Sequence, residues 1–184
     1  MKFSTVLNEN NTNSNGNNRG KILKIINSVP GIRYRDILRL TNLNNGTLSH
    51  HLSILEKMSI IKISRTENSN ITRYFPASTP SGETLILSYL KIKTTKGIIL
   101  MLLDADGNGA SFSEIVNHIK KAPSTTSWNL KRLVDSEIVG RKRGREVSLF
   151  FLLNKELVEK LVGENNKTLL DRSINNYISI IDEL

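Results

Sequence analysis

Ser49-His50-His51-Leu52-Ser53-Ile54-Leu55 recurs further along the chain, where it aligns with Ser127-Trp128-Asn129-Leu130-Lys131-Arg132-Leu133. The pair Ile60-Ile61 that follows the first copy aligns with Ile138-Val139 after the second. An internal repeat of this kind normally marks a duplicated structural unit. We therefore expect two modules of similar fold.

The repeat divides the 184-residue chain into five parts. Residues 19–77 and 96–154 are the predicted modules, each near the lower size limit for independent stability. Residues 78–95 are expected to form a linker helix. Residues 155–184 are predicted to be helical and to offer an apolar stripe for dimerisation. Residues 1–18 are rich in Asn, and such a segment buries too little apolar surface to offset its ordering entropy, so a disordered arm is predicted.

Each module is predicted to contain three helices followed by a β-hairpin. In the first module, Asn44 is a good N-cap for a third helix whose Leu48, Leu52 and Leu55 recur at helical spacing. Two short helices joined by the tight turn before Asn45 indicate a helix-turn-helix. The predicted elements are helices from Arg19 to Pro30, from Arg33 to Leu40 and from Asn45 to Met58, and strands over 60–64 and 72–75.

The second module repeats this order. Pro123 suits the first turn of its third helix. Between the modules, Thr79-Pro80 is expected to start the linker helix. The predicted elements are helices over 98–103, 112–121 and 123–136 and a hairpin over 139–153. The fold class that follows is mainly α with small β-hairpins, an α+β arrangement.

The chain is strongly basic, with 26 Lys and Arg against 17 Asp and Glu and a formal net charge of +9. Such a balance favours polyanionic partners, either nucleic acid or anionic lipid. No apolar run approaches the length of about 18 residues that a membrane helix needs. The absence of cysteine excludes disulfides, thiolate catalysis and Cys-ligated zinc. Because no membrane segment is predicted and nucleic acid is a favoured partner, we expect a cytoplasmic, nucleoid-associated protein.

The run from Tyr34 to Ile61 resembles the winged helix-turn-helix of ArsR-like and MarR-like transcription regulators, especially archaeal ones. In those families a Thr-hydrophobic-Ser-x-His-Leu-x-x-Leu core marks the recognition helix, and Thr47 to Leu55 matches it. The match is weaker over Lys96 to Asn154, where Thr126 stands at the position of Leu48. The resemblance implies a tandem winged helix-turn-helix architecture in which the hairpins are wings and double-stranded DNA is the partner.

A recognition helix presents its N-terminal residues and one face to base edges, whereas the preceding helix and the wing contact phosphates. A solvated polar face is the alternative interpretation. The candidates in the first module are Asn45, Gly46, Thr47, Ser49, His50 and Ser53 on the third helix, Arg33 and Arg35 on the second, and Arg65 and Arg73 on the wing.

In the second module, the hairpin contains the densest basic cluster of the chain. Several cations on one hairpin repel each other unless an anion is near, so phosphate contact is predicted. Trp128 is expected to pack against the linker or a partner. The candidates for DNA contact are Ser124, Thr125, Ser127 and Lys131 on the helix and Arg141, Lys142, Arg143 and Arg145 on the wing.

Other chemistry is not indicated by the sequence. Asp104 to Gly109 copies the start of an EF-hand calcium loop, but Ile115 stands where the bidentate Glu is required and Glu114 is one place early. We therefore interpret this stretch as an interhelical turn. The histidines are too scattered for a metal site, and His51 is expected to pack beside the core. No P-loop, nucleophile elbow or paired carboxylates occur, so no enzyme, cofactor or metal is predicted.

The favoured function is a sequence-specific DNA-binding transcription regulator. A homodimer through the C-terminal helix is slightly favoured over a pseudo-dimer formed by the two modules of one chain. The alternatives are an architectural or replication-initiation DNA-binding protein and a protein-interaction scaffold. Binding to duplex DNA at physiological salt separates the scaffold from the other two.

Overall fold

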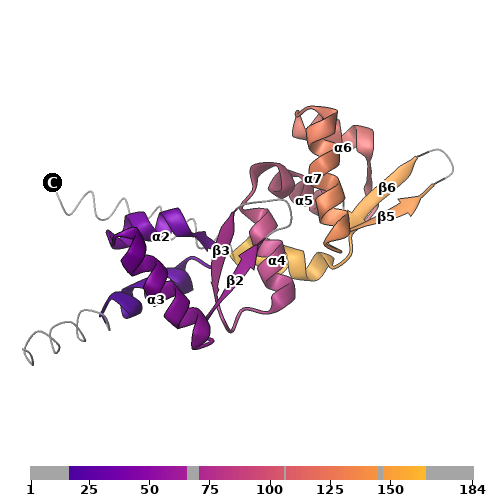
Figure 1. The fold of residues 1–184 in the computed structure, drawn as a ribbon. Helices are drawn as coiled ribbons and strands as arrows, with labels where there is room; N and C mark the ends of the chain where they lie inside the picture. Colours follow the sequence, from indigo (N-terminus) through magenta and orange to yellow (C-terminus); the bar gives the residue numbers. More distant parts are fainter. Residues whose placement is uncertain (1–16, 66–70, 106, 145–146, 165–184) are drawn as a thin grey trace, which may run out of the picture. The chain divides into compact units, whose positions relative to one another are not determined.

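A computed structural model describes residues 17–65, 71–105, 107–144 and 147–164 (Figure 1). The chain divides into two compact units, Met1–Ser88 and Tyr89–Leu184. Both are mainly helical, and each contains one small antiparallel sheet. Within the described ranges, no helix is long and apolar enough to cross a membrane.

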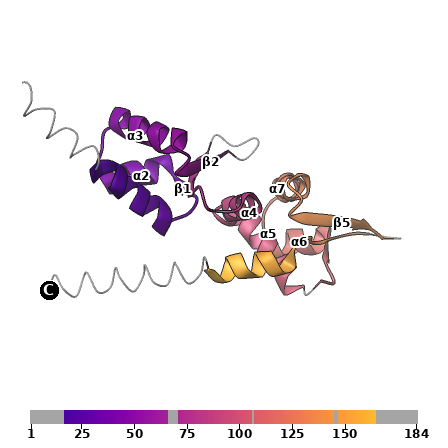
Figure 2. The ribbon, with the colours of Figure 1, turned by 90° about the horizontal axis from the view of Figure 1, so that it is seen from below.

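The first unit follows the predicted order of three helices and a hairpin, with one additional strand. Figure 2 shows α2 and α3 side by side in this unit. Its elements are a helix over residues 17–28, β1 (Ile32–Arg33), α2 (Tyr34–Thr41), α3 (Asn45–Lys57), β2 (Ile61–Arg65), β3 (Thr72–Pro76) and the start of α4 (Ser81–Leu90).

Local chemistry explains where α2 and α3 begin and end. Asn42 adopts the left-handed conformation (φ 57°) and closes α2 through a backbone N–H bond to Leu38. The Asn44 side chain then accepts a hydrogen bond of 2.8 Å from the Thr47 N–H and caps α3 as predicted. Such a cap satisfies one of the free N–H groups of a helix start and stabilises the helix by about 1 kcal/mol.

The core of the first unit is built from one face of each helix. Ile22, Ile26, Ile37 and Leu48 are completely buried, and Leu52 and Leu55 are nearly so. Burial of each such side chain contributes roughly 1.5–3 kcal/mol. The sheet closes the core, because Ile32, Ile61 and Tyr74 from its three strands belong to the same buried cluster.

A short strand, β1, was not predicted. It pairs with β3 through Ile32 and Tyr74, and β3 therefore lies in the centre of a sheet of order β1-β3-β2. The strand has two residues, too few to show the alternation of apolar and polar side chains by which strands are recognised. The second unit has the same unpredicted feature in β4, which pairs with β6.

The second unit repeats the arrangement, with sheet order β4-β6-β5. Figure 1 shows the β5–β6 hairpin projecting from its helices. The elements are α5 (Lys93–Asp104), β4 (Ala110–Ser111), α6 (Phe112–Ile119), α7 (Pro123–Asp135), β5 (Val139–Arg143), β6 (Ser148–Leu152) and a helix over residues 155–164.

The stretch that resembles a calcium loop leads from α5 to β4. Gly109 has φ +72°, and a Cβ there would lie 2.7 Å from the Phe150 carbonyl oxygen, so the close approach of the two strands requires glycine. Glu114 has a structural role instead: with Ser111 it forms a capping box at the start of α6. These hydrogen bonds from Ser111 lower the pKa of Glu114.

The two units keep the same residue spacing. α2 and α6, α3 and α7, and β2 and β5 each begin 78 positions apart, as Tyr34 and Phe112 do. The residues with a left-handed backbone conformation keep this spacing as well: Asn42 and Ser59 in the first unit correspond to Lys120 and Glu137 in the second. The spacing is 76 on either side of this stretch, both for the first helices, which begin at residues 17 and 93, and for β3 and β6. The second unit thus has a longer connection before β4 and a shorter loop after β5.

Two predicted segments lie wholly or mainly outside the described residues. They are the Asn-rich arm, of which residues 1–16 are not described, and the amphipathic stripe within 165–184. One boundary of the arm was wrong, because Asn17 and Asn18 are already helical.

Candidate nucleic-acid interface

The exposed face of α3 holds most of the base-contacting candidates of the first unit. Thr47 is half-buried, and its N–H is held by the Asn44 cap. A Cβ at Gly46 would meet only the Asn44 side chain, at 3.5 Å, so this position is open. The exposed candidates are Asn45, Gly46, Ser49, His50 and Ser53.

Tyr34 fixes the start of α3, a role that we did not predict. Its hydroxyl donates to the Asn45 carbonyl oxygen at 2.9 Å and lies 3.1 Å from Ser49 Oγ. The first residue of α2 thus orients the N-terminal turn of α3. In the second unit the equivalent residues are Phe112, Pro123 and Ser127, so the phenolic oxygen is missing there.

The two adjacent histidines of α3 have opposite environments. His50 is exposed, whereas 1% of the His51 surface is exposed, as predicted for a residue beside the core. Neither ring nitrogen of His51 has a hydrogen-bond partner within the described residues. Burial lowers the pKa of His51, and the nearby charges of His50 and Arg19 lower it further.

This environment predicts an acid-sensitive first unit. Because the pKa of His51 is lower in the folded chain than the ordinary value of 6.5, the unfolded chain binds more protons below that pH. Folding stability should therefore fall as the pH drops below about 6.5, by at most about 1.4 kcal/mol per pH unit. Urea unfolding between pH 7.5 and 5 measures this loss.

The matched variant is His51→Asn, because Asn129 occupies the equivalent place in the second unit. It should flatten the pH dependence of the first unit's unfolding. An identical dependence in the variant and the parent would assign the acid sensitivity to another group.

The basic candidates around α2 and the first wing differ in their availability. Arg35 and Arg65 are exposed. Arg33 is exposed but pairs with Asp36 at 2.9 Å, and this carboxylate raises the pKa of Arg33. Arg73 departs from the prediction: it is buried on the central strand β3, and its Nη1 donates to the Gly31 carbonyl oxygen at 3.0 Å. We therefore correct Arg73 from a phosphate contact to a structural residue.

On α7, the exposed candidates are Ser124, Thr125, Ser127 and Lys131. Lys131 forms an ion pair of 2.6 Å with Asp135, one helical turn later. Trp128 is 47% exposed, and its expected packing against the linker or a partner stays a prediction. It packs on Arg132, which is buried.

The second wing presents three of its predicted cations to solvent. Lys142 and Arg143 are exposed at the end of β5. Arg141 is exposed too, but its Nη2 donates to Ser148 Oγ at 3.1 Å and its guanidinium lies over the Phe150 ring at 5.7 Å. Arg145 lies outside the described residues.

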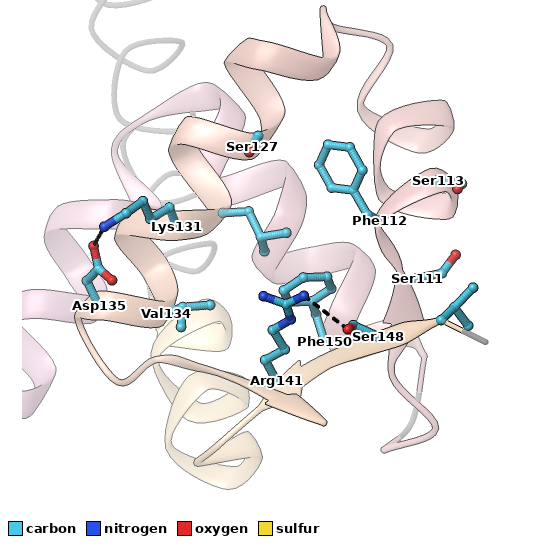
Figure 3. A pocket seen from close by; sticks show the side chains of 12 residues that line it. Ser111, Phe112, Ser113, Ser127, Lys131, Val134, Asp135, Arg141, Ser148 and Phe150 are labelled. Carbon is cyan, nitrogen blue, oxygen red and sulfur yellow. Dashed lines mark hydrogen bonds and ion pairs between the residues drawn. The ribbon is translucent and has the colours of Figure 1, made fainter. Parts of the chain in front are cut away.

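A groove of about 660 Å³ lies between α6, α7 and the β5–β6 hairpin (Figure 3). Its apolar lining includes Phe112 and Phe150, and Arg141 and Ser148 meet at one side. Lys131 points along α7 toward Asp135. The groove places Arg141 of the hairpin and Ser127 of α7 around one concave surface.

Among the described residues, no three His, Asp or Glu side chains are grouped so that they could hold a metal ion.

Residues 17–62 match the family model described as winged helix-turn-helix DNA-binding. An uncharacterized HTH-type transcriptional regulator of Methanocaldococcus jannaschii is 34% identical over 124 residues, which make up 67% of this chain and 30% of that protein. The chain therefore spans less than a third of the length of this relative. The predicted resemblance to archaeal regulators with a helix-turn-helix is confirmed.

Two solved structures of ZitR from Lactococcus lactis, a zinc-responsive MarR family member, are also similar. One covers 76% of this chain and 96% of its own, with 17% sequence identity and a TM-score of 0.33. The other, of a mutant, covers 75% and 94%, with 15% identity and a TM-score of 0.34.

Proposed function

We propose that the chain is a sequence-specific, double-stranded DNA-binding transcription regulator, because residues 17–62 match a winged helix-turn-helix DNA-binding family model. In this proposal residues 19–77 and 96–154 are tandem winged helix-turn-helix domains joined by a linker helix over 78–95. The observation that supports it best is the capped helix α3, whose exposed polar face lies inside the matched region.

The first domain is proposed to read bases. α3 enters the major groove, where Asn45, Ser49, His50 and Ser53 meet base edges and Gly46 permits close approach of the backbone. Tyr34 holds the first turn of this helix in place, which supports a fixed register on the duplex. Arg33 and Arg35 contact the backbone from α2, and Arg65 from the first wing.

The second domain is proposed to anchor phosphates. Arg141, Lys142, Arg143 and Arg145 on its wing contact the phosphate backbone or enter the minor groove, and Ser124, Thr125, Ser127 and Lys131 face the duplex from α7. The exposed faces of α3 and α7 differ in sequence, so one chain would bind an asymmetric site. A homodimer through residues 155–184 would instead give a palindromic site.

The test is to incubate the purified chain with sheared genomic DNA at about 150 mM salt and to sequence the retained fragments. A sharply enriched motif is expected, and its symmetry separates the single chain from the homodimer. Uniform retention would contradict sequence specificity and favour an architectural protein. No retention would contradict DNA binding and favour a protein-interaction scaffold.

A further inference from the structure

Arg132 on α7 is enclosed by two aromatic rings. Only 7% of its surface is exposed. The guanidinium carbon lies 4.5 Å from the ring centroid of Trp128 and 5.3 Å from that of Tyr89. These rings attract the cation through their π electrons but do not replace the in-plane acceptors that guanidinium N–H groups require.

Two of the three guanidinium nitrogens of Arg132 are left without acceptors. Nε and Nη2 are buried and have no hydrogen-bond partner among the residues that the structure describes. A buried donor without an acceptor lowers stability, and a charged donor lowers it more. The equivalent residue of the first unit is Ile54, so the fold itself does not require an arginine here. Folding alone therefore does not explain Arg132.

The missing partner of Arg132 should be an oxyanion. The guanidinium fork matches carboxylate and phosphate groups, which accept two of its N–H bonds at once. The exposed residues of the same helix favour phosphate, because Ser124, Thr125 and Ser127 carry hydroxyl donors and Lys131 is a cation. The carboxylate of Asp135 is already paired with Lys131.

Of the two rings that pack on the Arg132 guanidinium, that of Trp128 is the one that is free to move. Tyr89 is buried, and its hydroxyl lies 2.8 Å from Ser136 Oγ, which holds the ring in place. Trp128 is 47% exposed and lies one helical turn before Arg132. A change of its rotamer would expose the edge of the guanidinium without disturbing the core.

We propose that Arg132 is a phosphate-binding residue that Trp128 covers in the free protein and uncovers when α7 meets a DNA backbone. This inference rests on the proposed function. It adds to the proposed function a role for Arg132 and a conformational step that accompanies binding.

Trp128 is the single tryptophan of the chain, so its fluorescence reports on this site alone. The full chain is titrated with a mixed-sequence DNA duplex at about 150 mM salt. The emission of Trp128 is expected to change and its quenching by acrylamide to increase as the duplex saturates the protein. Unchanged emission at saturation would overturn the proposal.

Arg132→Met should lower the affinity for duplex DNA about tenfold and flatten the salt dependence by about one unit. The same variant should melt at an equal or higher temperature, because an apolar side chain replaces a buried unpaired charge. A merely structural Arg132 would give the opposite melting result. Arg132→Lys, which keeps the charge but not the fork, should fold like the parent and bind more weakly. Lys93→Met, an exposed charge elsewhere in the unit, is the matched control.

The outcomes separate this inference from the proposed function. If wing variants weaken duplex binding but Arg132→Met and Arg132→Lys do not, the inference alone fails. If the parent binds no duplex, both fail. A response of Trp128 to poly-glutamate, without a response to the duplex, would identify an acidic protein as the partner and overturn the assignment to DNA.

Discussion

His50→Glu should abolish the preference of the chain for its specific duplex, with a loss of affinity of about 100-fold or more. His50 is exposed on the face of α3 that we propose to meet base edges. A carboxylate there would be repelled by the DNA backbone and would face base-edge acceptors to which it cannot donate. Fluorescence anisotropy with the enriched motif and with a scrambled duplex measures both affinities.

The same charge change elsewhere serves as the control. Asn27→Glu, at an exposed position on the helix of residues 17–28, should leave the specific affinity within about twofold. Ser49→Glu should also abolish specific binding, but it removes the contact with Tyr34 as well, so His50 gives the cleaner test. Unchanged specific affinity in His50→Glu would remove α3 from the interface.

Lys142→Ala combined with Arg143→Ala should weaken binding to every duplex by roughly 10- to 100-fold and flatten the slope of log K against log salt by about two. Both side chains are exposed at the end of β5, so the backbone pairing with β6 should survive the change. The measurement is a salt titration of binding to the specific and the scrambled duplex.

Two lysines from other surfaces control for the loss of net charge. Lys24→Ala with Lys93→Ala changes the total charge equally at exposed positions outside the proposed interface. Its salt slope should match that of the parent. If the wing variant and this control give the same slope, the second wing does not contact phosphate.

The sequence predicted most of the architecture because apolar spacing and helix-terminal residues are local signals. The Asn44 cap and the start of α7 at Pro123 were both placed correctly. The strands β1 and β4 were missed because two residues give no periodic pattern. The three-residue separation of Ser111 and Glu114 is a sequence signal for a capping box, but the comparison with a calcium loop treats Glu114 only as a displaced ligand.

The site was less predictable because several of its features depend on contacts between residues far apart in the sequence. Charge alone put Arg73 on the surface, whereas the added strand β1 makes β3 central and brings the Gly31 carbonyl to its guanidinium. The hydroxyl of Tyr34 reaches Ser49 across the turn between α2 and α3. The stack of Trp128 on Arg132 is the exception, since its four-residue spacing on a helix was a usable signal.

The constant spacing from β1 to β2 and from β4 to β5 implies that these two segments can be exchanged between the units. Residues 32–65 and 110–143 have the same length and the same order of elements, and the differences in length lie in the connections before and after each segment. A chimera that carries the first segment in both places would therefore preserve every strand register up to the wing loop. The two proposed binding surfaces of such a chain would be identical. A repeated half-site in the DNA that it selects would then reveal the distance and the relative orientation of the two surfaces.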